Sequence, residues 1–326
     1  MQQQSIPDVC FDRRAIPAAA LEGWWSAPDG QRIRRIDWNS QADPVRGSLL
    51  FLPGRADFYE KYLDTLDHWF AMGWNVTSID WRGQGLSGRL GDDPATGHVD
   101  DFGVWVSDLA QFWAEWRATQ PSPHVLVGHS MGGHIVLRAL AMGLVKPDAA
   151  VLVAPMLGFL PQHAPPGLLH GVARAMAWLR GAKRSAWKGS EKPGRLPDDR
   201  FDLLTHDSKR YADEIWWRKE RPQLALGPPS WGWIESALAS MRLLDQPGLL
   251  ESIESPVCIL STDADALVSP RATQQAAQRI RDARTLTFGE EARHEILREE
   301  DPIRDRAITA IDGFFGDVAP AAGNPA

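Results

Sequence analysis

The sequence predicts an α/β domain built around a mostly parallel β-sheet. Short apolar runs of strand length alternate with longer stretches of helical periodicity along most of the 326 residues. The composition agrees, because 44% hydrophobic and 24% charged residues are typical of a globular chain that buries a large core. A third observation is a Gly-x-Ser-x-Gly motif that follows one apolar run and opens a helical stretch.

Six apolar runs have the length of strands and lie between turn-forming or polar residues. They span residues 48–52, 75–79, 125–127, 149–153, 257–260 and 284–288. Five segments with helical periodicity lie between or after these runs, at residues 58–72, 102–118, 132–142, 271–281 and 302–315. This order predicts a central sheet that is flanked by helices.

The alternation stops in the middle of the chain. Between Met156 and Asp245 only irregular helical patterns occur, and they are interrupted by proline pairs at 165–166 and 228–229. We therefore expect a mainly helical cap that is inserted between two strands of the core. The predicted division is a core of residues 1–155 and 246–326 with a cap of residues 156–245.

Charge and targeting signals exclude several classes of protein. The 35 basic and 42 acidic residues give a net charge of −7 and form no basic stripe, so we expect no nucleic-acid partner. The N-terminal residues lack the basic and apolar regions of a signal peptide, and no apolar run reaches the ~18 residues of a membrane span. Cys10 and Cys258 are far apart and form no redox motif. These features predict a cytoplasmic protein.

The sharpest chemical signal is the motif around Ser130. Gly128 and Gly132 flank it at the spacing of a nucleophile elbow, a strained turn between strand and helix that holds a serine hydroxyl above a sheet. A serine hydroxyl is a weak nucleophile and needs a base, which in such sheets follows in the chain order serine, acid, histidine. His294 is the one histidine beyond His206, so we predict that it is the base.

The acid is expected in the turn after the strand at 257–260, where two aspartates stand. We favour Asp265 because Leu267 and the residues after it form the start of a helix, and Asp263 is the alternative. Two backbone N–H groups are expected to stabilise the oxyanion: that of Met131, which follows the nucleophile, and that of Arg55, in the loop after the first predicted strand. The Arg55 side chain either binds a substrate phosphate or forms a structural ion pair.

Two other motifs are dismissed. Residues 83–88 read Gly-x-Gly-x-x-Gly after a strand, but a loop rather than a helix follows them, so we do not predict a dinucleotide site. No cluster of Cys and His residues has the spacing of a metal site, and His294 has no second histidine four residues on. We therefore predict neither a metal nor another cofactor.

Taken together, the motifs resemble the α/β-hydrolase fold, and within it the branch of monoglyceride lipases and bacterial lysophospholipases. The resemblance runs from about Pro53 to Glu300. It rests on Pro53-Gly54-Arg55, Asp80-Trp81-Arg82-Gly83-Gln84-Gly85-Leu86-Ser87-Gly88, Gly97-His98-Val99, Gly128-His129-Ser130-Met131-Gly132-Gly133 and His294-Glu295-Ile296-Leu297. Monoglyceride lipases carry His-Gly where this chain has Pro53-Gly54, so the bacterial lysophospholipase branch is the more similar one.

The resemblance implies a catalytic triad of Ser130, Asp265 and His294 with an oxyanion hole at Arg55 and Met131. It also implies hydrolysis of a lipid-like ester, from a lysophospholipid or a monoacylglycerol, through an acyl-enzyme. A general carboxylesterase, a thioesterase or an aminopeptidase on the same fold is the alternative within this class. A non-catalytic protein that binds a membrane surface is the alternative from a different class.

The cap contains two features that bear on a lipid substrate. Five apolar residues repeat at helical spacing and form either an acyl-chain tunnel or packing against the core: Leu168, Leu169, Val172, Met176 and Leu179. Residues 180–200 carry seven basic and three acidic side chains. This stretch either contacts an anionic membrane at its inner face or is a solvated loop.

Overall fold

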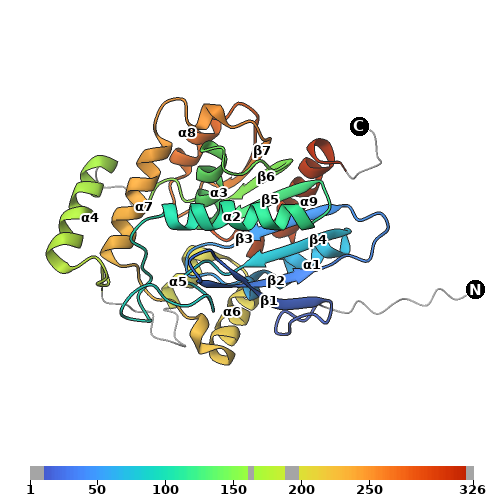
Figure 1. The fold of residues 1–326 in the computed structure, drawn as a ribbon, viewed down its shortest axis with the longest axis horizontal. Coiled ribbons are helices and arrows are strands. Elements are labelled where there is room, and N and C mark those ends of the chain that lie inside the picture. Colours follow the sequence, from blue (N-terminus) through green and yellow to red (C-terminus); the bar gives the residue numbers. More distant parts are fainter. Residues whose placement is uncertain (1–10, 161–164, 188–197, 321–326) are drawn as a thin grey trace, which may run out of the picture.

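The computed structural model describes residues 11–160, 165–187 and 198–320. Its centre is an eight-stranded sheet in the order β1-β2-β4-β3-β5-β6-β7-β8 (Figure 1). The six strands from β4 to β8 in this order are parallel, while β2 pairs antiparallel with both β1 and β4. The strands are β1 Ala20–Ser26, β2 Arg32–Trp38, β3 Gly47–Leu52, β4 Trp74–Ile79, β5 His124–His129, β6 Ala149–Val153, β7 Val257–Thr262 and β8 Ala283–Phe288.

The predicted mostly parallel sheet is confirmed, and each of the six predicted strands is present. Side chains alternate between the two faces of the sheet, so that Leu50 and Leu52 of β3 join one core cluster while Leu49 and Phe51 join the other. Both faces of β3, β5 and β6 are buried, because a parallel sheet is covered on both sides. This is the reason why these three strands appear in the sequence as continuous apolar runs.

Helices cover both faces of the sheet (Figure 1). Side chains of α2, α3 and α8 belong to the first core cluster, and those of α1 and α9 belong to the second. The core helices are α1 Leu63–Ala71, α2 Gly103–Thr119, α3 Met131–Ala141, α8 Pro270–Arg279 and α9 Asp301–Val318. Short 3₁₀ turns are η1 Tyr59–Tyr62, η2 Pro222–Leu224, η3 Leu250–Ser252 and η4 Ile296–Arg298.

A helical insertion lies between β6 and β7, as the sequence predicted. It contains α4 Pro166–Arg180, α5 Asp198–Leu204, α6 Ser208–Glu220 and α7 Trp231–Leu244. Helix α7 packs into the first core cluster, and α4 lies beside α7 and contributes Ala173 to the same cluster (Figure 1). The exact boundaries of the cap, residues 156 and 245, remain a prediction.

The described helices include none that combines the length and the apolar character needed to cross a bilayer. Cys258 is a buried free thiol of β7, and burial raises its pKa to about 11. Cys10 lies outside the described residues.

Candidate active site

Ser130 occupies the turn between β5 and α3 and has a left-handed backbone conformation, with φ 51° and ψ −114°. Such strain is tolerated where the surrounding chain leaves no alternative. A Cβ atom on Gly132 would lie 2.3 Å from the carbonyl oxygen of Leu52, and one on Gly128 would lie 2.8 Å from Gly133. Only glycine therefore allows the chain to pass so closely, and the geometry is that of a nucleophile elbow.

The structure brings together the three residues that the sequence predicted as a triad. His294 Nε2 lies 2.9 Å from Ser130 Oγ, and His294 Nδ1 lies 2.7 Å from Asp265 Oδ2. The other carboxylate oxygen, Oδ1, accepts backbone N–H groups from Leu267 and Val268 at 2.8 and 2.9 Å, which leaves Oδ2 directed at the imidazole. All three triad side chains are buried.

Asp263, the alternative acid, is exposed, and its Oδ1 accepts a 3.4 Å hydrogen bond from Gln274. The two aspartates therefore have distinct environments, although only one residue separates them in the chain. A turn at the end of β7 directs Asp265 inward and Asp263 outward. Asp265 alone of the two contacts the imidazole.

The groups around the imidazole shift its pKa in opposite directions. Burial disfavours the charged form of His294, but the carboxylate of Asp265 outweighs it and raises the pKa of the imidazole above its ordinary value of 6.5. Burial also opposes the charge on Asp265, yet His294 and the backbone N–H groups of Val268 and Leu267 together lower the pKa of that carboxyl. An ionised acid next to a basic imidazole is the arrangement that a serine nucleophile requires.

The predicted oxyanion donors come from two separate segments. Met131 is the first residue of α3, and the N–H groups of a helix's first turn have no acceptor within the helix. Arg55 lies in the loop after β3, which is held by a hydrogen bond from Gly54 N to Asp57 and by one of 2.6 Å from Ala56 N to Gln84. This loop is preorganised, as a site for a developing negative charge must be.

The side chain of Arg55 contacts the inserted segment. Its guanidinium donates to the carbonyl oxygen of Gly227 and lies over the Trp233 ring, 5.2 Å from the centroid. Both partners belong to the inserted segment. We call the loop after β3 the oxyanion loop. The side chain of Arg55 therefore connects the oxyanion loop to the cap.

A cavity of about 510 Å³ opens above Ser130 and His294. This volume lies within the range of small-molecule sites, roughly 300–1,000 Å³. Apolar side chains from the cap and from the loops after the strands form most of its wall, among them Phe159, Leu160, Leu204, Trp233, Leu267 and Val268. The cavity can accept an apolar chain next to the nucleophile.

The apolar repeat of α4 does not form this wall. Leu168, Val172 and Leu179 are 60%, 51% and 65% exposed, so they neither line a tunnel nor pack on the core. Of the five residues in the repeat, Leu169 packs against the first core cluster. The expectation that this repeat is either tunnel or packing is therefore wrong for its exposed members.

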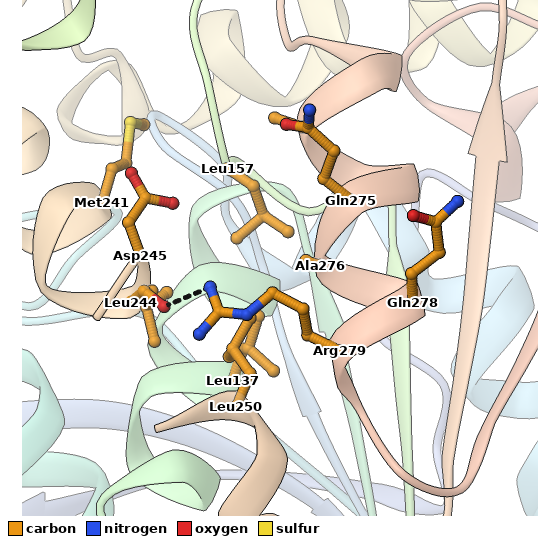
Figure 2. Close-up of a pocket in the computed structure, with 11 residues that line it drawn as sticks. Leu137, Leu157, Met241, Leu244, Asp245, Leu250, Gln275, Ala276, Gln278 and Arg279 are labelled. Atoms are coloured by element: carbon orange, nitrogen blue, oxygen red, sulfur yellow. Dashed lines mark hydrogen bonds between the residues drawn. The ribbon is translucent and has the colours of Figure 1, made fainter. Parts of the chain in front are cut away.

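A second cavity, of about 340 Å³, lies between α3, α7 and α8, and Figure 2 shows its lining. Leu137, Leu157 and Leu250 form an apolar floor, while the Arg279 guanidinium at the rim donates to the carbonyl oxygen of Leu244 at 3.2 Å. None of the triad residues lines it. Ser130 and His294 line the first cavity instead.

The glycine-rich run at residues 83–88 is a loop, as expected, and no helix starts there. A Cβ on Gly85 would lie 2.2 Å from the carboxylate of Asp80, which also accepts the Leu86 N–H at 2.9 Å. The turn is thus closed around an internal carboxylate. A phosphate would meet a negative charge in this position.

Sequence reasoning missed a group of buried charged residues beside the triad. Asp57, His129 and Glu295 have potential ligand atoms within 4.8 Å of one another, the one such grouping found in the described part of the chain. The ammonium of Lys61 donates to Asp57 at 2.5 Å and to Glu295 at 2.6 Å. The positive charge between these carboxylates therefore comes from the chain itself. Glu295 directly follows the predicted base, but sequence spacing alone does not connect it with Lys61.

Comparisons with known proteins agree with this geometry. The model of the family described as "Serine aminopeptidase, S33" matches residues 43–301. Lysophospholipase L2 of Escherichia coli K12 is 32% identical over 289 residues, which is 85% of this chain and 82% of the relative. A probable lysophospholipase L2 of Haemophilus influenzae is 27% identical over 88% of this chain and 90% of its own length.

The fold also matches a solved structure. A soluble variant of monoglyceride lipase from Saccharomyces cerevisiae, in complex with a substrate analogue, has a TM-score of 0.76. The alignment covers 95% of this chain and 99% of the lipase at 17% sequence identity. The match shows that the two chains share a fold.

Proposed function

The chain is an α/β hydrolase of the lysophospholipase L2 family, and from this membership we propose that it hydrolyses the carboxylic ester of a single-chain lipid, a lysophospholipid or a monoacylglycerol. The observation that carries the proposal is the hydrogen-bonded series from Asp265 through His294 to Ser130, at the floor of an apolar cavity. A buried series of this kind serves nucleophilic catalysis, and the cavity suits an acyl chain.

In the proposed mechanism Ser130 Oγ attacks the ester carbonyl carbon while His294 Nε2 takes its proton. Asp265 holds the imidazole in place and stabilises its charged form. The negative charge on the former carbonyl oxygen is stabilised by the N–H groups of Met131 and Arg55. His294 then gives its proton to the leaving alcohol, and an acyl-enzyme remains. Water activated by His294 attacks the acyl-enzyme, which releases the fatty acid and restores Ser130.

The substrate class is tested by comparing three kinds of ester: lysophosphatidylethanolamine, monoacylglycerol and p-nitrophenyl esters of several chain lengths. We expect kcat/KM to rise with chain length, because each methylene that enters the apolar cavity contributes about 0.8 kcal/mol. Preference for short esters, for a thioester or for a peptide would favour the alternative functions. Failure of a fluorophosphonate probe to label the protein would favour a non-catalytic role.

The second part of the proposal concerns the cap and a lipid surface. Four apolar side chains of α4 are exposed: Leu168, Val172, Trp178 and Leu179. Exposed Arg174 and Arg180 on the same helix add positive charge. Part of the basic stretch predicted at residues 180–200, residues 188–197, lies outside the described residues. Apolar side chains combined with basic ones suit an anionic membrane, which for the predicted cytoplasmic location is its inner face.

We expect Trp178→Ser to weaken binding to vesicles of phosphatidylethanolamine and phosphatidylglycerol by about tenfold, since burying one such side chain in lipid contributes roughly 1.5–3 kcal/mol. Trp178 is 83% exposed, so its loss leaves the core intact. Co-sedimentation with vesicles measures the effect. Trp24→Ser is the matched control, because Trp24 is 48% exposed on β1 rather than on the cap. Equal losses in both variants would contradict a specific role of α4.

The pH dependence of kcat/KM is expected to follow the protonation state of His294, the proposed base. His294 must be neutral to take the serine proton, so activity falls as the pH drops through the pKa of its imidazole. That pKa is raised above 6.5 by Asp265 despite the opposing effect of burial. We therefore expect the acid limb of the profile, the fall in kcat/KM on the acidic side, to have its midpoint above pH 6.5. Initial rates with a soluble p-nitrophenyl ester measure it. A profile that stays flat between about pH 5 and 8 would contradict His294 as the base.

A further inference from the structure

A cluster of six buried charged side chains lies beside the triad. It comprises three cations and three carboxylates: Lys61, Arg218, Arg298, Asp57, Glu214 and Glu295. The opposite charges are equal in number, and each carboxylate pairs with at least one cation. Such a balanced arrangement makes the burial of these charges possible. We call it the Lys61 cluster.

Lys61 is the residue that joins the separate parts of this cluster. Its ammonium lies 2.5 Å from Asp57 Oδ1, 2.6 Å from Glu295 Oε1 and 3.0 Å from Glu214 Oε2. The ammonium donates hydrogen bonds to Asp57 and Glu295, and it forms an ion pair with Glu214. Burial opposes the charge on Lys61, but Asp57, Glu214 and Glu295 outweigh it and raise the pKa of the ammonium above its ordinary value.

Each of the three carboxylates belongs to a different functional segment. Asp57 closes the oxyanion loop, because its Oδ2 accepts the Gly54 N–H at 3.0 Å and the Tyr62 hydroxyl at 2.8 Å. Glu295 is the residue next to His294. Glu214 comes from α6 of the cap, where Arg218 also contacts it at 3.0 Å. One ammonium thus connects the oxyanion loop, the loop of the base and the cap.

We propose that Lys61 is a positioning residue that fixes the oxyanion loop relative to His294 and connects both to the cap through Glu214. The inference rests on the proposed function and extends it, since nothing in the elbow motif involves Lys61. The ammonium touches neither the substrate nor the reacting atoms. It acts through Asp57 on the Arg55 N–H and through Glu295 on the imidazole. A displacement of about 1 Å between such groups costs about 100-fold in rate.

The cluster also sets the charge around the base. The charged groups that face His294 are Asp265 from the β7 loop, Glu295 beside it and Asp57 from the oxyanion loop, and all three raise the pKa of its imidazole. His129 of β5 lies 5.0 Å away between ring centroids, and burial together with the charge on His294 lowers its pKa to about 3, so it is neutral. Loss of the Lys61 charge leaves Asp57 and Glu295 less compensated. That change favours the imidazolium and moves the acid limb to higher pH.

The test begins with the wild-type protein and a p-nitrophenyl ester; the absence of activity and of fluorophosphonate labelling would refute the proposed function rather than the role of Lys61. With an active wild type, we expect Lys61→Met to lower kcat by about 10–100-fold. We further expect KM to change by less than about twofold and the acid limb to shift upward. A role in stability alone would alter neither kcat nor the pH profile of the folded protein.

Two further variants make the outcome decisive. Lys61→Met/Glu214→Gln leaves the cluster with two cations and two carboxylates while the connection stays broken; its kcat should remain low. Arg82→Met is the matched control, because Arg82 pairs with buried Asp108 at 2.7 Å in a cluster that does not touch the triad. It should lower Tm but keep kcat and the acid limb. Wild-type kcat and pH profile in either folded Lys61 variant would overturn the proposal.

Discussion

Alanine at position 130 is expected to abolish ester hydrolysis while the protein remains folded. Removal of a serine nucleophile from a complete triad lowers kcat by about 10⁶-fold. The hydroxyl of Ser130 contacts His294 Nε2, and its loss removes the one nucleophile at the end of the hydrogen-bonded series. The small side chain of alanine fits the same turn, because the strain of the elbow is set by the flanking glycines.

The effect is measured by steady-state kinetics with a p-nitrophenyl ester, by fluorophosphonate labelling and by Tm. Ser107→Ala is the control, since Ser107 is an exposed residue of α2 and should keep both activity and labelling. A Ser130→Ala variant with more than a few per cent of wild-type activity would refute the acyl-enzyme mechanism. So would a probe that still labels the variant at a single site.

The fold could be predicted where burial leaves a continuous signal in the sequence. Strands β3, β5 and β6 are buried along their whole length, so apolar residues follow one another without interruption. The hairpin of β1 and β2 was missed because it lies at the edge of the sheet, where one face is polar. Strand β2 carries three arginines among its seven residues.

Arg34 illustrates why hydrophobicity alone does not predict β2. Its guanidinium is buried, but the carboxylates of Glu60 and Asp80 lie at 2.5 and 3.0 Å from it. Both carboxylates come from other segments, and nothing in the local sequence indicates that they will meet the arginine. The signal available was the turn between the strands, where Gly30 has φ 85° and follows Pro28 and Asp29.

The candidate site also contains residues that the sequence could predict and residues that it could not. Ser130, Asp265 and His294 could be predicted because each stands at the end of a strand, and the ends of parallel strands meet at one edge of the sheet. Lys61 and Glu214 could not, because their residue types are common on helix surfaces and their meeting depends on how the cap rests on the core. The exposed apolar side chains of α4 were misjudged for a related reason: periodicity indicates a helix with an apolar face, but it does not say what covers that face.

The replacement of Asp265 by asparagine tests which of the two aspartates is the acid. Its expected loss of kcat is the second largest, after that of Ser130→Ala. Asparagine keeps the shape of the side chain but loses the negative charge, so the imidazolium that forms during attack is no longer stabilised and the tautomer of His294 is no longer fixed. We expect kcat to fall by about 10⁴-fold, equivalent to about 5.5 kcal/mol in the barrier. The same change also removes a group that raises the pKa of His294, so the remaining activity should have its acid limb at lower pH.

Asp263→Asn provides the matched control, because the substitution is chemically identical and lies two positions earlier in the same turn. Its carboxylate is exposed and accepts one 3.4 Å hydrogen bond from Gln274, so we expect kcat within about twofold of wild type and an unchanged acid limb. If instead Asp263→Asn lost activity while Asp265→Asn kept it, the acid would have to reach His294 through a rearranged turn. In that case the 2.7 Å contact between Asp265 and the imidazole would belong to a resting state rather than to the reacting one. Kinetics of the two variants, measured side by side with the same ester, therefore identify which carboxylate supports the base.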